Sequence, residues 1–288
     1  MAQSTTKRGR RKRAVKEVWA DGGAYEAEVG RWSRLVAAEL VERLDLPVGS
    51  RWLDVGCGTG ALVEAVARLG APAEVVGVDP SKSYVAHARE RMADRRVRFE
   101  VADAAKLPFE DASFDAVTSG LVLNFVPDPA KAAAEMARVA RPDGTVAAYV
   151  WDYADGMQLS RCFWDAAAAL DPGAAQLDEG RRFPLCHPDA LAELFGGAGL
   201  AEVETWAIEV PTVFSDFYDV WGPLLGGQGP GPGYVATLDE PARTRLRDRL
   251  RADLPIDPDG LIHLVARAWA VRGRRTQAAA GGSPPANS

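Results

Sequence analysis

The feature that most constrains this chain is the segment RWLDVGCGTGALVEAVARLG at residues 51–70, in which three glycines fall within five positions. The apolar residues before the glycines are typical of a buried strand, and those after them recur at helical spacing. Gly56, Gly58 and Gly60 therefore occupy a strand-to-helix turn. Glycine permits backbone angles that other residues avoid and leaves no Cβ to keep a ligand from the main chain. The free N–H groups of the following helix favour polar or anionic ligand groups, so this turn predicts a bound ligand.

The glycine turn alone is compatible with two kinds of cofactor. The glycines and Ala61 fit the dinucleotide fingerprint G-x-G-x-x-G/A, and Asp79 lies near the acidic position expected about 20 residues further on. Asp79 ends a second apolar strand in EVVGVDPSKSYVAHARERM, where Pro80 and Ser81 open a helix. A carboxylate at that place can accept hydrogen bonds from both hydroxyls of a ribose. These features suit NAD and S-adenosylmethionine equally, so an NAD-dependent oxidoreductase remains an alternative.

The next segment, VRFEVADAAKLPFEDASFDAV, favours S-adenosylmethionine. It predicts a strand over residues 97–101, then Asp103 and Ala104, then another strand from residue 114. An aspartate followed by a small residue with a free N–H can bond the exocyclic amine and a ring nitrogen of adenine together. Hydride-transfer dehydrogenases do not require this pair.

Four successive segments carry a family resemblance: LDVGCGTG, GVDPS, ADAAKLPFEDASFDAV and EMARVARPDGTVAAYVWD. In this order and at these separations, the sequence resembles the class I S-adenosylmethionine-dependent methyltransferases. Within them it is similar to the type 11 group, which includes the ubiquinone/menaquinone-biosynthesis C-methyltransferases. The resemblance is strong over residues 20–152 and weak elsewhere. It implies an enzyme that transfers a methyl group and releases S-adenosylhomocysteine. A methyltransferase-like domain that binds the cofactor only as a regulatory module is a further alternative.

The resemblance also implies the fold. We expect a Rossmann-like, doubly wound α/β fold: a mostly parallel seven-stranded sheet with an antiparallel edge strand, and helical insertions that form a lid. The sequence patterns AEVETWAIEV and LIHLVARAWAVRG are strand-like and would supply the antiparallel edge. A helix is expected around residues 159–170, and the Gly/Pro-rich stretch between the two strands is expected to be loop.

The cofactor site follows from the motifs and the resemblance together. Asp54 is expected to brace the glycine turn and to reach the amino end of the cofactor. In related methyltransferases a segment before the first strand covers the cofactor, and YEAEVGRWSRLV resembles it, with Arg31 pairing with the methionine carboxylate and Tyr25 against the methyl group. An amphipathic helix with Arg31 in solvent is the alternative. The expected cofactor-binding residues are Tyr25, Arg31, Trp32, Asp54, Gly56, Gly58, Gly60, Asp79, Pro80, Ser81, Asp103, Ala104, Ser119 and Leu121.

The methyl acceptor is expected beyond the carboxyl ends of the strands, where ligands bind in open α/β sheets. The candidate pocket residues are Asn124, Trp151, Tyr153 and His187. His187 is also the one candidate for a catalytic base, with a helix cap or a surface residue as the alternative. Aromatic residues are concentrated in the insertions at 154–185 and 210–255. Although many of them would be core, they favour an apolar or aromatic acceptor over a sugar.

Domain boundaries come from composition and charge. Residues 1–16 are strongly basic without apolar periodicity and are expected to form a disordered arm, with binding of an acidic partner as the alternative. Residues 276–288 are expected to form a second disordered tail. The methyltransferase domain is expected over residues 17–275, with its cofactor-binding core over 45–152. The net charge is −6 in spite of the basic arm, so the body is acidic and a nucleic-acid substrate is not expected.

The location of the protein is inferred from its cysteines and its apolar runs. The cysteines at 57, 162 and 186 form no C-x-x-C motif, which indicates a reducing compartment, and the cytoplasm is expected. No apolar run reaches the length of a membrane span, and the three separated histidines suggest no metal site. The sequence does not give the acceptor, the atom that is methylated or the oligomeric state.

Overall fold

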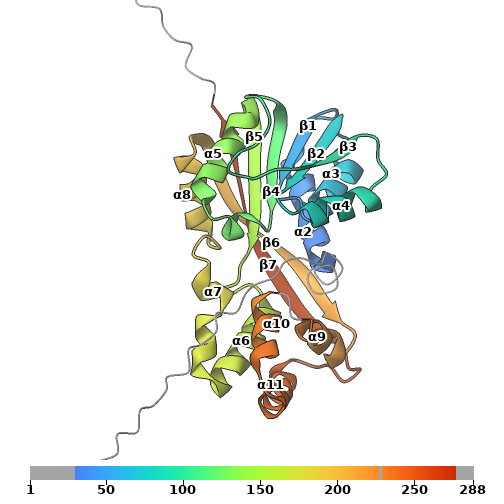
Figure 1. Cartoon of the computed structure of the whole chain (residues 1–288), viewed down its shortest axis with the longest axis vertical. Coiled ribbons are helices and arrows are strands. Elements are labelled where there is room, and N and C mark those ends of the chain that lie inside the picture. Colours follow the sequence, from blue (N-terminus) through green and yellow to red (C-terminus); the bar gives the residue numbers. More distant parts are fainter. Residues whose placement is uncertain (1–29, 227–228, 277–288) are drawn as a thin grey trace, which may run out of the picture.

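The computed structural model describes residues 30–226 and 229–276 and shows a sheet layered between helices (Figure 1). The strands are β1 (Arg51–Val55), β2 (Glu74–Asp79), β3 (Val97–Val101), β4 (Phe114–Gly120), β5 (Ala140–Trp151), β6 (Leu200–Phe214) and β7 (Ile262–Arg275). The helices are α2 (Arg31–Leu44), α3 (Ala61–Leu69), α4 (Lys82–Arg91), α5 (Pro129–Val139), α6 (Gln158–Leu170), α7 (Glu179–Arg182), α8 (Pro188–Gly197), α9 (Phe217–Leu224), α10 (Pro230–Thr237) and α11 (Glu240–Asp253). Two short 3-10 helices are η2 (Leu123–Phe125) and η3 (Pro172–Gln176).

The seven strands form one sheet in the order β3-β2-β1-β4-β5-β7-β6. The first five are parallel, and β7 runs antiparallel to both β5 and β6. The predicted mostly parallel sheet with an antiparallel end is therefore confirmed. The chain order reverses between β1 and β4, and a crevice at the carboxyl ends of the strands is expected at such a reversal.

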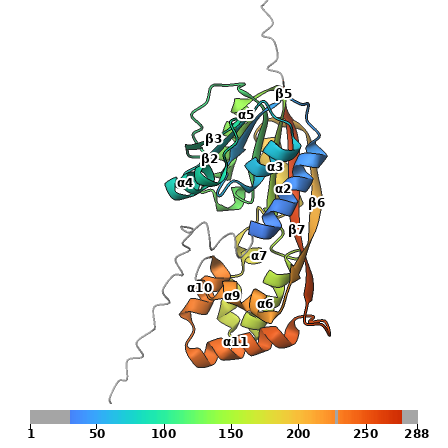
Figure 2. The ribbon, with the colours of Figure 1, turned by 90° about the vertical axis from the view of Figure 1, so that its right-hand side faces the viewer.

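Both faces of the sheet are covered by helices, which the two views show (Figure 2). On one face α2, α3 and α4 bury apolar residues such as Val36 and Val63 against the sheet. On the other face α5 and α8 do the same with Met136 and Phe195. Burial of apolar area on both faces is the main stabilisation of this layered arrangement and fixes the ends of the central strands in place.

The long strands β6 and β7 extend past the rest of the sheet toward a separate group of helices, which we call the lid helices: α6, α9, α10 and α11 (Figures 1 and 2). Phe214 at the end of β6 and Leu264 near the start of β7 belong to one buried cluster with Trp164 of α6 and Leu250 of α11. The two strands thus attach the lid helices to the sheet.

The predicted helix around residues 159–170 is confirmed as α6, but the expectation of a loop through residues 210–255 is wrong. β6 continues to Phe214, and α9, α10 and α11 follow it. Pro230 is compatible with helix because it lies at the beginning of α10, where an N–H has no helical partner in any case. α9 and α11 begin after Asp216 and Asp239, whose side chains cap them.

Several expectations fall on parts of the chain that the structure leaves undescribed. The basic arm at residues 1–16, Tyr25 and the tail beyond residue 276 lie outside the described ranges. Within those ranges, no helix has both the length and the apolar character that crossing a membrane requires.

Candidate functional site

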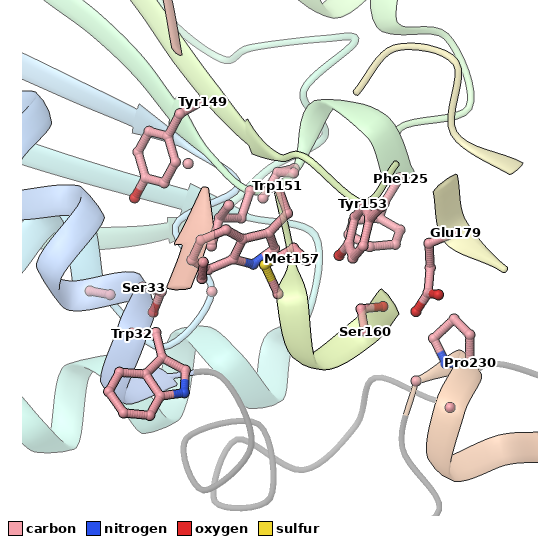
Figure 3. A pocket seen from close by; sticks show the side chains of 18 of the residues that line it. Trp32, Ser33, Phe125, Tyr149, Trp151, Tyr153, Met157, Ser160, Glu179 and Pro230 are labelled. Atoms are coloured by element: carbon pink, nitrogen blue, oxygen red, sulfur yellow. The ribbon is translucent and has the colours of Figure 1, made fainter. Parts of the chain in front are cut away.

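A cavity of about 430 Å³ lies at the carboxyl ends of the strands and continues to the lid helices. Its wall includes the glycine turn after β1, the ends of β2, β4 and β5, the start of α2, and residues of α6, α7, α9 and α10. Figure 3 shows Trp32 and Ser33 on one side of it and Glu179 and Pro230 on the other. One continuous cavity therefore joins the predicted cofactor region to the lid.

The glycine turn is held against the sheet by its backbone. The N–H groups of Gly56 and Cys57 donate to the carbonyl of Val78 at 2.7 and 2.9 Å. Gly56 and Gly58 both have positive φ, 78° and 51°, which other residues adopt only with strain. A Cβ on Gly58 would meet no atom within 4 Å, and Gly58 is part of the cavity wall, so its backbone is open to a ligand.

Gly60 differs from Gly56 and Gly58 in its position relative to the cavity. It also has a positive φ, 95°, and it is the N-cap of α3. A Cβ there would face Phe99 and Met92, and Gly60 is not part of the cavity wall. Its role in the structure is therefore to turn the chain into α3.

Asp79 is buried at the end of β2 and forms part of the cavity wall. Its Oδ2 accepts a hydrogen bond from the N–H of Gly58 at 3.0 Å, and its Oδ1 accepts one from the N–H of Ser81 at 2.8 Å. Burial raises the pKa of Asp79, and these two backbone hydrogen bonds act in the opposite direction. The carboxylate thus ties the glycine turn to the start of α4, and each oxygen retains a lone pair for a further donor. Pro80 and Ser81 also form part of the wall.

Asp54 is the second buried carboxyl group in this wall. Burial, followed by the negative charge of Asp79, raises the pKa of Asp54 to about 8, while a hydrogen bond from Thr118 acts to lower it. Its Oδ1 is buried and has no hydrogen-bond partner in the described part of the chain. Buried polar atoms are almost always hydrogen-bonded in proteins, so this oxygen fits the donor group of a ligand.

These observations test whether the residues fit S-adenosylmethionine. The open backbone at Gly58, the carboxylate of Asp79 at the end of β2 and the unpaired oxygen of Asp54 all lie on one cavity. A nucleoside joined to an amino acid needs a close backbone approach, an acceptor for ribose hydroxyls and an acceptor for an ammonium group. The donor and acceptor set of the wall matches these needs.

The segment before β1 is only partly where the sequence predicts it. Trp32 and Ser33 of α2 form part of the cavity wall. Arg31 does not: its Nη1 lies 3.2 Å from Asp219 Oδ2 of α9, and its guanidinium lies over the ring of Trp32. In this structure Arg31 thus joins α2 to the lid helices through Nη1, and its pairing with a ligand carboxylate stays a prediction.

Of the remaining predicted cofactor residues, some form part of the cavity wall and others do not. Leu121, with a φ of 61°, forms part of the wall. Ser119 is buried and donates to the carbonyl of Val55 at 2.8 Å, which joins β4 to β1. Asp103 and Ala104 follow β3 at the same edge of the sheet, beside the end of β2, but neither is part of the cavity wall. The Oδ1 of Asp103 accepts a hydrogen bond from the N–H of Ala105.

Of the predicted acceptor residues, Trp151 and Tyr153 form part of the wall, and Asn124 and His187 do not. The side chain of His187 is 62% exposed, and its Nδ1 accepts from the N–H of Asp189 as the N-cap of α8. The structure therefore agrees with the alternative of a helix cap and does not bring His187 to the cavity. Within the described residues, no group of His, Cys, Asp and Glu side chains is arranged to hold a metal ion.

Sequence reasoning missed one acidic residue of the wall, Glu179 of α7. Burial raises the pKa of Glu179 to about 7. In the sequence this glutamate stands in QLDEGRRF, a polar run that is typical of an exposed turn. Its burial comes from contacts with other elements, Trp164 of α6 among them, so no local pattern signals it.

Comparisons with known proteins identify the family of this chain. Residues 53–148 match the family model described as "Methyltransferase domain". The chain is similar to the methyltransferase GfsG of Streptomyces halstedii, at 34% identity over 73% of this chain and 76% of that protein. It is also similar to a demethylmenaquinone methyltransferase of Roseiflexus castenholzii, at 36% identity over 54% of this chain and 70% of that protein.

A solved structure shows the same fold. The chain superposes on phosphoethanolamine N-methyltransferase 2 of Haemonchus contortus, in complex with phosphomonomethylethanolamine and S-adenosylhomocysteine, with a TM-score of 0.56. The match covers 89% of this chain and 57% of that one at 21% identity. Together with the sequence relatives, these results decide between the two cofactors: the chain belongs to the class I S-adenosylmethionine-dependent methyltransferases of the type 11 group, and S-adenosylmethionine is its cofactor.

Proposed function

We propose that this enzyme methylates a small, largely apolar or aromatic molecule bound between the sheet and the lid helices. The observation that carries the proposal is the apolar and aromatic wall that faces the glycine turn. Its members include Phe125, Tyr149, Trp151, Tyr153, Met157, Phe163, Trp164, Phe214 and Leu224. Aromatic side chains provide large apolar contact areas for ring-shaped or aliphatic ligands, whereas a sugar site needs a denser set of polar groups. The similarity to a demethylmenaquinone methyltransferase supports an acceptor of this kind.

The cofactor-binding roles are part of the same proposal. When bound, S-adenosylmethionine supplies a methyl group on a cationic sulfur, which is a good leaving group. Asp79 would hold the ribose hydroxyls with the lone pairs that its backbone partners leave available. Asp54 would accept from the amino end of the cofactor through its unpaired Oδ1. Asp103 and Ala104 remain our prediction for the adenine contact, and the Asp103→Ala variant should lose discrimination between adenosyl and inosyl cofactor analogues.

The lid helices would exclude water and align the acceptor with the methyl group. Alignment of this kind can contribute roughly 7–11 kcal/mol to lowering a barrier. We further propose that residues 17–275 act as one methyltransferase domain in which the segments 154–185 and 210–255 form the acceptor side of the site. The aromatic residues that these segments place in the cavity wall support this division.

Two further proposals concern partners and location. The acidic body of the chain supports a small molecule over a nucleic acid as acceptor. The three cysteines are all free, which supports a reducing compartment, and we propose the cytoplasm.

An acceptor panel tests the proposed function. The full chain is incubated with S-adenosylmethionine that carries a labelled methyl group, together with apolar aromatic acceptors in one set and sugars or short oligonucleotides in the other. We expect label in one or more members of the aromatic set and a strong reduction of that label in the Asp79→Ala variant. Label only in the polar set would refute the proposed acceptor class.

A further inference from the structure

Glu179 is a buried carboxyl group in the part of the cavity wall that belongs to the lid side. Glu179 is 8% exposed and is the first residue of the short helix α7. In Figure 3 its carboxylate is directed toward the part of the cavity where Ser160 and Pro230 lie, on the opposite side from Trp32. The mechanism proposed above assigns no role to it.

One oxygen of this carboxylate is held by the protein. The indole Nε1–H of Trp164 donates to Oε2 of Glu179, and Trp164 itself is buried against Phe163 and Tyr234. The other polar contact of the carboxylate is with the backbone N–H of Glu179. Within the described ranges, no other side chain donates a hydrogen bond to it. A carboxylate that is fixed at one oxygen and faces a mainly apolar cavity has acceptor capacity left for a ligand.

Several charged and titratable groups lie around Glu179, and two of them form an ion pair. Burial is the largest cause that raises its pKa to about 7; Asp178 raises it further, and Trp164 and Arg182 lower it. Asp178 is paired with Arg161 of α6, whose Nη1 donates to its Oδ2 at 2.9 Å. The other titratable neighbours are Cys186, whose pKa Glu179 helps to raise, and Tyr234 of α10, whose ring centroid lies 6.0 Å from that of Trp164. The hydrogen-bond partner of Arg161 is therefore Asp178, although its charge is also attracted to Glu179.

We propose that Glu179 is the residue that selects the acceptor: it accepts a hydrogen bond from a weakly acidic O–H group, that of a phenol or enol, on an otherwise apolar molecule. This rests on the proposed function and names the substrate class more closely. A ligand hydroxyl would add a further hydrogen bond to this buried carboxylate, and the wall of the cavity also offers apolar contacts through Phe163 and Leu224. A site built to bond a hydroxyl discriminates strongly against the analogue that lacks it.

Binding of two probes, one with a hydroxyl hydrogen and one with a methyl group in its place, tests the proposal. The probes are 2-naphthol and its methyl ether 2-methoxynaphthalene, titrated calorimetrically into the full chain with saturating S-adenosylhomocysteine. The hydrogen bond to an ionised carboxylate predicts that wild type prefers 2-naphthol by about tenfold or more above pH 7. Glu179→Gln should lose most of this preference. The matched control Glu240→Gln, an exposed glutamate at the start of α11, should keep it.

The pH profile separates recognition by this carboxylate from a merely structural effect. Below its pKa, Glu179 is protonated and is no longer a full acceptor, so the preference of wild type should decline as pH falls through about 7. The Glu179→Gln profile should be flat. Trp164→Phe removes a hydrogen bond that lowers the pKa, so the midpoint of its profile should move to higher pH. S-adenosylhomocysteine affinity, measured for each variant, reports whether the fold is intact.

Each outcome decides the question. Absence of 2-naphthol binding to wild type, equal binding of the two probes, or an unchanged preference in Glu179→Gln would overturn the role of Glu179. The proposed function stands or falls separately: transfer of label to apolar acceptors that lack any hydroxyl would preserve it while the Glu179 proposal fails. Transfer only to sugars or nucleic acids would refute the proposed function itself.

Discussion

Asp79 is the residue through which the cofactor account is most simply tested, because one carboxylate connects the glycine turn, α4 and the cavity. Asp79→Ala should weaken S-adenosylhomocysteine binding by more than about 1 kcal/mol, the lower range for a hydrogen bond to a charged group. Calorimetry on the folded variant measures this. Asp111→Ala, at a mostly exposed aspartate, serves as the control. An unchanged dissociation constant in a folded Asp79→Ala protein would remove Asp79 from the ribose site.

Asp54 predicts a pH dependence of stability. Its folded pKa is about 8, against an ordinary value of 3.8, so the folded state keeps a proton that the unfolded state releases. Its contribution to the free energy of unfolding therefore falls as pH rises from about 4 to about 8. The Asp54→Asn side chain does not titrate. The free energy of unfolding of this variant, relative to that of wild type, should therefore increase over that pH window, by on the order of a few kcal/mol. Urea unfolding at several pH values without cofactor measures this, and parallel curves for the two proteins would contradict the assignment.

At the scale of elements, two glycines of the turn between β1 and α3 have different roles. Gly56 is required for stability, and Gly58 leaves room for the ligand. A Cβ on Gly56 would lie 2.5 Å from Val122 Cγ1, in addition to the strain of its positive φ, so Gly56→Ala should lower the free energy of unfolding markedly. Gly58→Ala meets no atom, so its stability cost should be limited to about 1–2 kcal/mol of backbone strain, while its methyl group enters the cavity and weakens S-adenosylhomocysteine binding. Gly196→Ala in α8 is the matched control. Equal stability losses at Gly56 and Gly58 would contradict this distinction.

The same elements show what the sequence can predict. The glycine turn, the placement of Asp79 and the strand character of β6 and β7 follow from local patterns, because strand alternation and turn chemistry are properties of neighbouring residues. The antiparallel pairing of β6 with β7 was expected from the family resemblance. The helices α10 and α11 were not predictable from composition, since prolines in a first helical turn look the same as prolines in a loop. Glu179 was missed for a related reason: its burial depends on Trp164 and on the lid helices, which only the tertiary structure places around it.

At the scale of the whole molecule, the site depends on α2 and on the lid helices that β6 and β7 carry, whereas the basic arm is predicted to be dispensable. Deleting residues 2–16, which lie outside the described ranges, should leave the melting temperature and S-adenosylhomocysteine affinity nearly unchanged, because like charges without apolar periodicity provide no face to bury. A longer deletion through Trp32 should weaken binding, since it removes part of the cavity wall. If the short deletion alone abolishes S-adenosylhomocysteine binding, residues 2–16 belong to the methyltransferase domain and the boundary after residue 16 is wrong.

The central claim is methyl transfer to a small, apolar or aromatic acceptor in the cavity under the lid helices. The most direct test supplies the full chain with S-adenosylmethionine labelled in its methyl group and with metabolites of the host cell, separated by polarity. The account predicts label in an apolar, low-molecular-weight fraction, with a strong reduction in Asp79→Ala and little change in Asp111→Ala. Label that appears only in sugars, protein or nucleic acid, while S-adenosylhomocysteine still binds tightly, would contradict it.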